Sequence, residues 1–385
     1  MSYVTHLECS ATGEALPAGR LTGLSPAGAP MLVRYDLAAV AARVDRDALA
    51  ARPATPWRFA ELLPLADPAD LVSLGETITP LIPLPTQGPG TLWVKDEGLL
   101  PTGSFKARGL ALAVSMARAL GARRLAIPTA GNAGAAMAAY AARAGLQADV
   151  FVPADAPRAA TDEIRLFGAA LHVVDGLIDA CGRALAERTA AEGWFDLSTL
   201  KEPYRIEGKK TMGLELAQQL GWRLPDAIFY PTGGGTGLIG MAKAFAELKA
   251  LGWVDGPPPR MVAVQTTGCA PVVRAHAAGR RTVEEPWQNV DTRVHGVRVP
   301  KPLGDRLILD GLYESDGFGW AVDDDAVDAA RLACARAHGL HLSPEGAACL
   351  AAHDQARAAG RLAPDARAVV FNSASGLKSP LPAGV

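Results

Sequence analysis

The sequence lacks an excess of charge of one sign, and it lacks long apolar segments. Its 385 residues include 38 Lys and Arg against 40 Asp and Glu, a formal net charge of −2. A nucleic-acid binder would show a basic excess, and no apolar run here reaches the roughly 20 residues of a membrane-spanning helix. The N-terminus, MSYVTHLECS, also lacks the basic and apolar regions of a signal peptide. We therefore expect neither a nucleic-acid partner nor a membrane partner.

Cysteine is scarce as well. The five cysteines are scattered along the chain: Cys9, Cys181, Cys269, Cys334 and Cys349. In a chain of this length, an odd and scattered set indicates reduced thiols rather than a disulfide framework. We therefore expect a cytoplasmic protein.

Apolar strand-like runs alternate with helical stretches through most of the chain. Runs without polar alternation suit parallel strands that helices cover on both faces, and they occupy residues 123–129, 148–153, 171–176, 226–231, 260–265 and 367–373. The alternation predicts a doubly wound α/β architecture, in which ligands bind at the carboxyl ends of strands. Residues 1–70 differ, because they contain many Pro and Gly residues and short strand-like pieces, with a helix expected around 36–50.

A glycine-rich loop follows the apolar run at 226–231. In PTGGGTG, backbone N–H groups can close around an anion at the start of a helix, and phosphate is the natural ligand. Gly235, Gly237 and Gly240 also fit the GxGxxG dinucleotide fingerprint, which needs an acidic residue at the end of the next strand. That strand ends at Gln265, and Asp255 precedes it, so a nicotinamide site is disfavoured. A tight packing turn without a ligand is the remaining interpretation.

Two further stretches allow competing interpretations. EGKKT (207–211) resembles the end of a Walker A loop, but Pro203 stands where the first glycine should be. In PTAGNAGAAMAAYAARAG (128–145), small residues around Asn132 bring backbone donors to a helix start that suits a carboxylate. Asn132 is alternatively an ordinary N-cap.

Lys106, in TGSFKARG, suggests a single ligand that would use both loops. A desolvated lysine loses its proton near neutral pH and can form an imine with an aldehyde. Together with one phosphate cradle and a second anion-binding helix start, this pattern predicts pyridoxal phosphate (PLP) as the cofactor. Without the other two loops, a surface lysine at a helix start would be the simpler interpretation.

Four segments, in this order, resemble the fold-type II PLP-dependent enzymes, and within them the threonine synthases. They are PTGSFKARG, TAGNAGAAMAAYAARAG, the stretch from EPYRIEGKKT to PTGGGTG, and SASGLKSP. The resemblance runs from about residue 70 to the C-terminus. It implies two doubly wound parallel-sheet domains, with residues 71–385 as the catalytic region and a smaller subdomain around 110–210 inserted into the larger one.

The resemblance extends weakly into residues 1–70, the predicted N-terminal extension. Relatives often begin with a pair of cysteine-glycine knuckles, and of the four knuckle positions here only Cys9 is still cysteine. Thr12, Leu24 and Ala27 cannot ligate zinc as a set. We expect no metal, and the histidines lack spaced partners that would suggest otherwise.

Carried onto this sequence, the family motifs imply the following site. Lys106 binds the cofactor aldehyde as a Schiff base and moves protons between substrate carbons, and Phe105 lies against the cofactor. Asn132 donates to the ring hydroxyl oxygen. The cofactor phosphate is held by Gly233, Gly234, Gly235, Thr236 and Gly237, and the substrate carboxylate by the backbone of Thr129, Ala130, Gly131, Asn132 and Ala133.

Ser373 takes the place of the hydroxyl partner of the pyridine nitrogen. A hydroxyl does not fully protonate the ring, so the cofactor favours elimination and replacement over transamination. The protein sets orientation and electronics, while the carbanion chemistry belongs to the cofactor.

The activity implied is that of a threonine synthase, a lyase that turns O-phospho-L-homoserine and water into threonine and phosphate. Such an enzyme needs a site for the leaving phosphate, for which Arg205 and Lys201 are the candidates. Leu200, Glu202 and Gly234 depart from the polar pattern of that site, and Ala107 replaces a common acid. A solvated basic turn is the alternative for Lys201 and Arg205.

These departures leave other functions open. A β-eliminating dehydratase or ammonia-lyase, acting on a hydroxy- or diamino acid, needs the same cofactor site but no phosphate subsite. A nicotinamide-dependent oxidoreductase would leave Lys106 without a role, and a catalytically silent binding protein would not need that lysine. We expect a homodimer that acts on a small amino-acid substrate.

Overall fold

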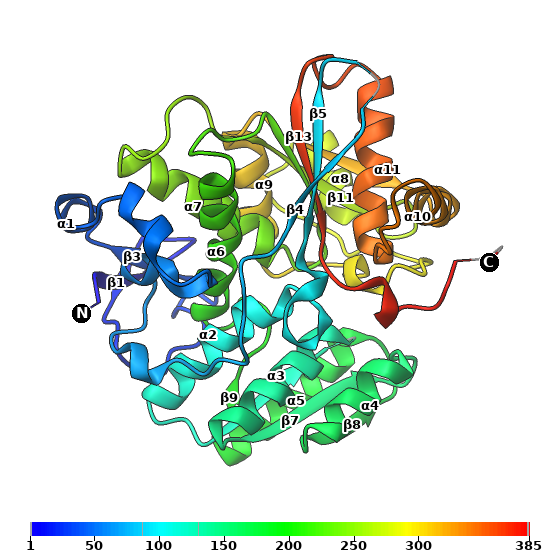
Figure 1. Cartoon of the computed structure of the whole chain (residues 1–385). Helices are drawn as coiled ribbons and strands as arrows, with labels where there is room; N and C mark the ends of the chain where they lie inside the picture. Colours follow the sequence, from blue (N-terminus) through cyan, green and yellow to red (C-terminus); the bar gives the residue numbers. More distant parts are fainter. Residues whose placement is uncertain (1, 87, 130, 383–384) are drawn as a thin grey trace. The chain divides into compact units, whose positions relative to one another are not determined.

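The structure is a computed structural model that describes residues 2–86, 88–129, 131–382 and 385 (Figure 1). The chain divides into two compact units. Unit 1 comprises Met1–Ile78, Lys106–Met212 and Ala250–Trp253, and unit 2 comprises Thr79–Phe105, Gly213–Lys249 and Val254–Val385. The functional division into an extension to residue 70 and a catalytic region from residue 71 stays a prediction.

Unit 1 contains two sheets within its described residues. The N-terminal one is antiparallel with strand order β2-β1-β3, and the other is parallel with order β8-β7-β6-β9. Their strands are β1 Val4–Cys9, β2 Ala15–Leu16, β3 Met31–Tyr35, β6 Arg124–Pro128, β7 Gln147–Pro153, β8 Ala170–Val174 and β9 Phe195–Asp196.

Helices cover both faces of the parallel sheet of unit 1. Val150 of β7 contacts the helix α3 at Gly134, whereas Phe151 packs with Cys181 and Leu185 of α5. Because successive strand side chains point to opposite faces, α3 and α5 lie on opposite sides. The helices are α1 Leu37–Arg43, η1 Asp47–Ala51, η2 Pro56–Leu62, η3 Pro68–Asp70, α2 Lys106–Ala119, α3 Asn132–Ala144, α4 Arg158–Leu166, α5 Ile178–Glu192 and, through Met212, α6 Tyr204–Gln219.

The described residues of unit 2 form one six-stranded sheet of order β12-β11-β10-β13-β5-β4, parallel except for the edge strand β4. Its strands are β4 Leu81–Leu84, β5 Thr91–Asp96, β10 Ala227–Pro231, β11 Arg260–Thr266, β12 Phe318–Val322 and β13 Arg367–Asn372. The central strands are buried and almost wholly apolar, as strands between two helical layers should be.

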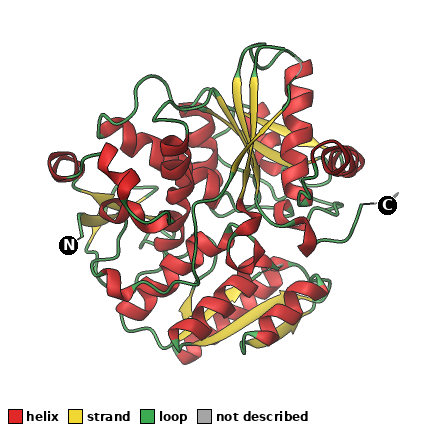
Figure 2. Cartoon of the chain, in the orientation of Figure 1, coloured by secondary structure: helices red, strands yellow, loops and turns green. Residues whose placement is uncertain are grey.

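Helices also cover both faces of this sheet (Figure 2). Phe229 of β10 packs in a cluster with Ala347 and Ala351 of α11, while its neighbour Tyr230 faces Gly237 of α7. The helices of unit 2, besides the end of α6, are η4 Glu97–Leu99, η5 Pro101–Gly103, α7 Thr236–Ala250, α8 Pro271–Ala277, η6 His295–Val297, α9 Asp305–Glu314, α10 Asp324–His338, α11 Pro344–Ala358 and η7 Gly376–Lys378. The predicted α/β class with two parallel-sheet domains is confirmed.

Every predicted parallel strand is present, and the helix expected around 36–50 is present but shorter than predicted. α1 ends at Arg43, and a separate 3-10 helix begins at Asp47. The carboxylate of Asp45 accepts a hydrogen bond from the backbone N–H of Asp47, a local bond that competes with helix continuation. In the described part of the chain, no helix is both long and apolar enough to cross a membrane.

Candidate active site

Lys106 is the first residue of α2. It is partly exposed, whereas the helix that follows is buried from Ala107 to Ala117. The predicted Schiff-base lysine is therefore not a freely solvated surface residue, since it begins a helix that forms part of the core of unit 1.

In unit 1, α2 crosses α6 at two glycines. A Cβ on Gly208 would lie 2.2 Å from the carbonyl oxygen of Arg108, and a Cβ on Gly109 would lie 3.0 Å from that of Arg205. The two backbones are therefore in direct contact, and the crossing joins the helix that starts at Lys106 to the helix that carries Arg205.

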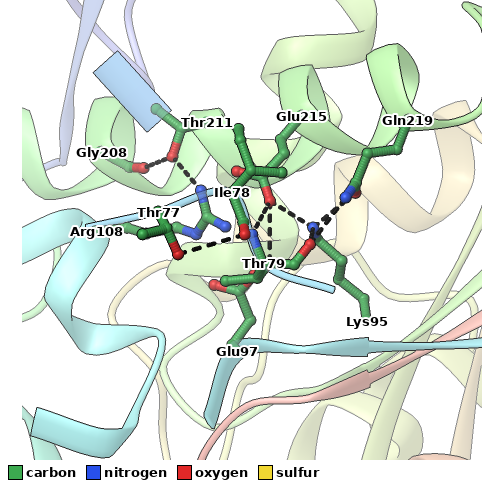
Figure 3. A network of polar contacts seen from close by, with 10 residues as sticks. All are labelled: Thr77, Ile78, Thr79, Lys95, Glu97, Arg108, Gly208, Thr211, Glu215 and Gln219. Carbon is green, nitrogen blue, oxygen red and sulfur yellow. Dashed lines mark hydrogen bonds and ion pairs between the residues drawn. The ribbon is translucent and has the colours of Figure 1, made fainter. Parts of the chain in front are cut away.

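A side-chain hydrogen bond fastens the same crossing. Nη1 of Arg108 donates to Oγ1 of Thr211 at 3.1 Å, and that hydroxyl donates to the carbonyl of Gly208 at 2.6 Å (Figure 3). EGKKT thus lies inside a helix, with Lys209 and Lys210 fully buried. The Walker A interpretation is wrong, because its lysine must sit in a loop at a helix N-terminus.

Arg205 is 1% exposed and lies in the first turn of α6. Its Nη1 donates to the carbonyl of Leu197 at 2.7 Å, while Nε and Nη2 have no hydrogen-bond partner among the described residues. Burial lowers the pKa of the guanidinium. The alternative of a solvated basic turn is wrong for Arg205, because its side chain is buried. A guanidinium with open donors inside the protein is suited to bind an anion.

Glu202 and Lys201 have partners within unit 1. The Glu202 carboxylate, which is 1% exposed, accepts hydrogen bonds from the backbone N–H groups of Tyr204 and Arg205, at 2.7 Å and 3.1 Å. Burial raises its pKa to about 7, against the opposing charge of Arg205. Lys201 is partly exposed, and its Nζ lies 3.1 Å from Oδ2 of Asp196.

The second predicted loop leads from β6 into α3. Thr129 is buried, and its hydroxyl accepts a hydrogen bond from the N–H of Gly131 at 3.0 Å. Gly131 is the N-cap of α3, and Asn132 is the first helical residue, so the interpretation of Asn132 as the N-cap is wrong. Ala133 follows in the first turn, where backbone N–H groups are available to an anion. Ala130 lies outside the described residues.

In unit 2, the glycine loop connects β10 to α7. A Cβ added to Gly233 would lie 2.5 Å from the carbonyl oxygen of Gly296. A Cβ on Gly235 would lie 2.2 Å from the Ile308 side chain, and one on Gly237 would lie 1.9 Å from the Tyr230 hydroxyl. Only glycine fits these three positions, so the backbone N–H groups stay uncovered. Thr236 opens α7 and is buried, and Gly234 is partly exposed. This cradle at a helix N-terminus fits a phosphate group.

Gln265 supports this loop, a role that the sequence alone did not indicate. Its side-chain nitrogen donates to the carbonyl of Thr232 at 3.0 Å, and its side-chain oxygen accepts from the N–H groups of Val272 and Val273 at 2.9 and 3.1 Å. The residue that replaces the ribose-binding acid of the nicotinamide alternative is thus a buried structural amide. Polar residues at the ends of buried strands are the signal that would have found it.

Ser373 follows β13 directly and is buried. Because β10 and β13 are adjacent parallel strands, the glycine loop and Ser373 lie side by side at the carboxyl ends of these strands. The N–H of Phe105 donates to the carbonyl of Ser373 at 2.9 Å, and the Phe105 ring packs edge-on against Tyr230 at 6.0 Å. Unit 2 therefore brings together three of the predicted cofactor contacts.

Unit 2 also contains a buried polar network around Lys95, near the carboxyl end of β5 (Figure 3). Nζ of Lys95 contacts Oε1 of Glu215 at 2.5 Å and the side-chain oxygen of Gln219 at 2.7 Å. The hydroxyl of Thr79 lies 2.7 Å from Oε1 of Glu97 and 3.0 Å from Oε1 of Glu215. Lys95, Glu97 and Glu215 are fully buried, although the charged run WVKDEG would ordinarily indicate a solvated surface.

A hollow of about 320 Å³ lies at the amino ends of β6, β7 and β8. Its polar lining includes Arg124 and Asp149, which are joined by a 2.7 Å ion pair. None of the predicted site residues lines it, in keeping with the rule that ligands of parallel sheets bind at the carboxyl ends.

A lysine at the start of a buried helix, a glycine cradle at a helix N-terminus and two parallel sheets are features expected of a PLP-dependent enzyme. The family model described as "Pyridoxal-phosphate dependent enzyme" matches residues 72–374. This chain belongs to that family, and pyridoxal phosphate is its cofactor.

Two curated relatives carry the description threonine synthase. That of Methanocaldococcus jannaschii is 30% identical over 377 residues, covering 97% of this chain and 92% of the relative. That of Mycobacterium bovis is 33% identical over 335 residues, covering 84% of this chain and 90% of the relative. This chain is therefore similar to threonine synthases along nearly its whole length.

Solved structures share the fold. The crystal structure of a PLP-dependent aspartate racemase matches with a TM-score of 0.67 at 23% identity, covering 78% of this chain and 90% of that one. The L-serine ammonia-lyase of the fungus Rhizomucor miehei matches with a TM-score of 0.65 at 21% identity, covering 78% and 94%. The glycine cradle, where a Cβ at Gly233, Gly235 or Gly237 would collide, fits the phosphate group of this cofactor.

Proposed function

We propose that this protein is a threonine synthase, which converts O-phospho-L-homoserine and water into L-threonine and phosphate by γ-elimination and β-addition. The similarity to threonine synthases supports this assignment. The observation that carries it is the buried Arg205, whose Nε and Nη2 have no partner among the described residues.

Arg205 is suited to the phosphate that leaves. A guanidinium presents a fixed fork of donors that matches phosphate oxygens and is worth more in a buried site than in water. Glu202 does not compete for this fork with a hydrogen bond, because its carboxylate is held by the backbone N–H groups of α6. The backbone carbonyl of Arg205 lies close to Gly109, one helical turn from Lys106, so the first turn of α6 passes beside the helix of the predicted catalytic lysine.

The other predicted residues have separate roles in the proposal. PLP, when bound, supplies the electron sink for a carbanion at the substrate α-carbon. Lys106 binds the cofactor and carries protons at its Nζ, Asn132 donates to the ring hydroxyl oxygen, and Ser373 is the partner of the ring nitrogen. Phe105 restricts the ring position. The N–H groups around Thr129–Ala133 bind the substrate carboxylate.

The decisive assay follows threonine and phosphate together from O-phospho-L-homoserine, with PLP-loaded protein. Equal amounts of both products would support the proposal. Bound cofactor with neither product would refute it.

Variants of the two basic residues sharpen this assay. Arg205→Gln should lower kcat/KM at least about a hundredfold, because a charge-assisted contact to phosphate is lost. Lys201→Gln is the matched control and should have a smaller effect, about fivefold, because Lys201 is already paired with Asp196. Equal effects of the two changes would contradict the role of Arg205 as the main phosphate ligand.

A second candidate is a β-eliminating dehydratase or ammonia-lyase. The segment around α6 balances two cations, Lys201 and Arg205, with two carboxylates, Asp196 and Glu202, so a neutral leaving group also suits it. Formation of 2-oxo acid and ammonia from L-serine, L-threonine or 2,3-diaminopropionate, without turnover of the phosphorylated substrate, would favour this candidate.

A further inference from the structure

The N-terminal antiparallel sheet of unit 1 contacts the helix that carries Arg205. Tyr35, the last residue of β3, donates its phenolic hydrogen to Oε2 of Glu207 at 2.7 Å. Nζ of Lys210 lies 3.9 Å from the centre of the Tyr35 ring and 2.7 Å from the same carboxylate oxygen. One aromatic side chain of the N-terminal sheet thus meets both charged groups.

Glu207 and Lys210 are fully buried. A buried ion pair regains its desolvation cost only when further hydrogen bonds satisfy the carboxylate and the ammonium group. The hydroxyl of Tyr35 supplies such a bond, and its ring supplies a cation–π contact. Both contacts of Tyr35 therefore stabilise the buried pair while β3 stays against α6.

The segment that precedes β3 passes close to the same region at a second point. A Cβ added at Gly23 would lie 3.5 Å from the carbonyl oxygen of Lys201. The N-terminal segment therefore lies near the chain four residues before Arg205 and contacts it two residues after Arg205. Both points lie within unit 1.

The two sides of α6 are occupied differently. With 3.6 residues per turn, Glu207 and Lys210 lie on the side roughly opposite Arg205 and Gly208. Gly208 faces α2, where the two backbones touch without intervening side chains. The hydrogen bond of Arg108 with Thr211 holds α6 on the α2 side, and the contacts of Tyr35 with Glu207 and Lys210 hold it on the other side.

We propose that the N-terminal sheet is a part of the substrate site, in which Tyr35 is a positioning residue that holds α6 on α2 and so places the Arg205 guanidinium toward an anionic group of the substrate. The nature of that group rests on the proposed function. The support of α6 by Tyr35 does not.

The first test compares hydrogen exchange of residues 204–212 in the PLP-loaded wild type and in Tyr35→Phe, which keeps the ring and removes one hydroxyl. Loss of a hydrogen bond to a charged group should speed exchange in this segment about tenfold. The matched control is Tyr313→Phe, which removes a phenolic donor to the carbonyl of Arg280 at 2.9 Å in unit 2 and should leave residues 204–212 unchanged.

The second test measures the affinity of the PLP-loaded protein for inorganic phosphate by calorimetry. Tyr35→Phe should weaken it about tenfold, with Tyr313→Phe unchanged, because a displaced Arg205 loses the geometry of a bidentate contact. In turnover of O-phospho-L-homoserine, KM should rise by the same factor while kcat changes less than about twofold, the pattern of lost uniform binding.

The possible outcomes separate the two proposals. Unchanged exchange in residues 204–212, or faster exchange there with unchanged phosphate affinity, would overturn the positioning role of Tyr35. A wild type that does not turn over the phosphorylated substrate would refute the proposed function alone, since the exchange and phosphate measurements would still decide the role of Tyr35.

Discussion

Glu202 and Arg205 lie three residues apart in a buried turn, and each has a different use. The Glu202 carboxylate binds backbone N–H groups at the start of α6, while two nitrogens of Arg205 have no partner among the described residues. A carboxylate that would repel phosphate in solution is here tied to the backbone, and burial brings its pKa to about 7. The side chain that departs from the family pattern is thus compatible with an anion nearby.

Glu202 gives the protein a specific dependence of stability on pH. Its pKa is about 7 when folded and 4.5 as the ordinary value, so the folded state binds more protons in between, and stability falls as pH rises through that window. Between about pH 5.5 and about pH 8, the wild type should lose about 2 kcal/mol more unfolding free energy than Glu202→Gln. Urea unfolding at both pH values measures this, and parallel losses in the two proteins would contradict it.

Lys106 is the residue on which the chemistry depends most. Lys106→Ala should reduce turnover about a thousandfold or more, since no other group can replace its covalent and proton-transfer roles. The change should leave the melting temperature nearly unchanged, because the side chain is partly exposed at a helix start. Lys249→Ala, at an exposed position in the last turn of α7, is the control. Substantial activity in Lys106→Ala would remove the central assignment.

At the scale of elements, the crossing of α2 and α6 decides how the site residues of unit 1 meet. The backbones of the two helices lie in direct contact at Gly109 and Gly208, because neither glycine has a side chain. The contact joins two segments about a hundred residues apart in sequence, and no helical periodicity in either segment indicates it.

Gly208→Ala tests the crossing. The new Cβ would lie 2.2 Å from the carbonyl of Arg108, a backbone atom that cannot move freely. We expect destabilisation of about 3 kcal/mol from overpacking, measured by urea unfolding. Gly182→Ala, in the interior of α5 with nothing within 4 Å, should instead stabilise the protein by about 1 kcal/mol through helix propensity. Similar effects at both sites would argue against a close crossing.

At the scale of the whole molecule, the reactivity of the buried thiols shows which part of the protein unfolds locally first. All five cysteines are free and buried, as expected for reduced thiols. The hydrogen bond of Cys9 with Ser25 lowers the pKa of its thiol to about 7, whereas burial raises the pKa of Cys181 and Cys334 to about 11. Burial also raises the pKa of Cys269 and Cys349, so among the five thiols Cys9 should have the largest thiolate fraction at neutral pH.

The native protein should accordingly react slowly with a thiol reagent, and Cys9 should be modified first, because the thiolate is the reactive form. After denaturation, all five cysteines should react. Peptide mapping at early times identifies the site. Modification of Cys181 or Cys334 before Cys9 would show that unit 1 or unit 2 opens elsewhere first. The predicted homodimer is tested separately by sedimentation against the chain mass of 40.0 kDa.

The sequence by itself determined the fold class, the cofactor and the positions of its motifs. Continuous apolar runs fix buried parallel strands, because helices must cover both faces of such a sheet, and the strand ends then locate the loops. Glycines in the loop after β10 and a lysine after Phe105 were recognisable because each requirement is local: a backbone that must approach an anion, and an amine at the start of a helix.

The tertiary structure alone decided which polar residues are buried and what they meet. Gln265, Lys95 and Glu215 resemble surface residues in the sequence, and only packing shows that they lie in the core. The burial of Arg205 with two open donors and the contact of Tyr35 with Glu207 depend on groups brought together from distant segments. Burial and long-range hydrogen bonding are properties of the assembled chain, so no local pattern encodes them.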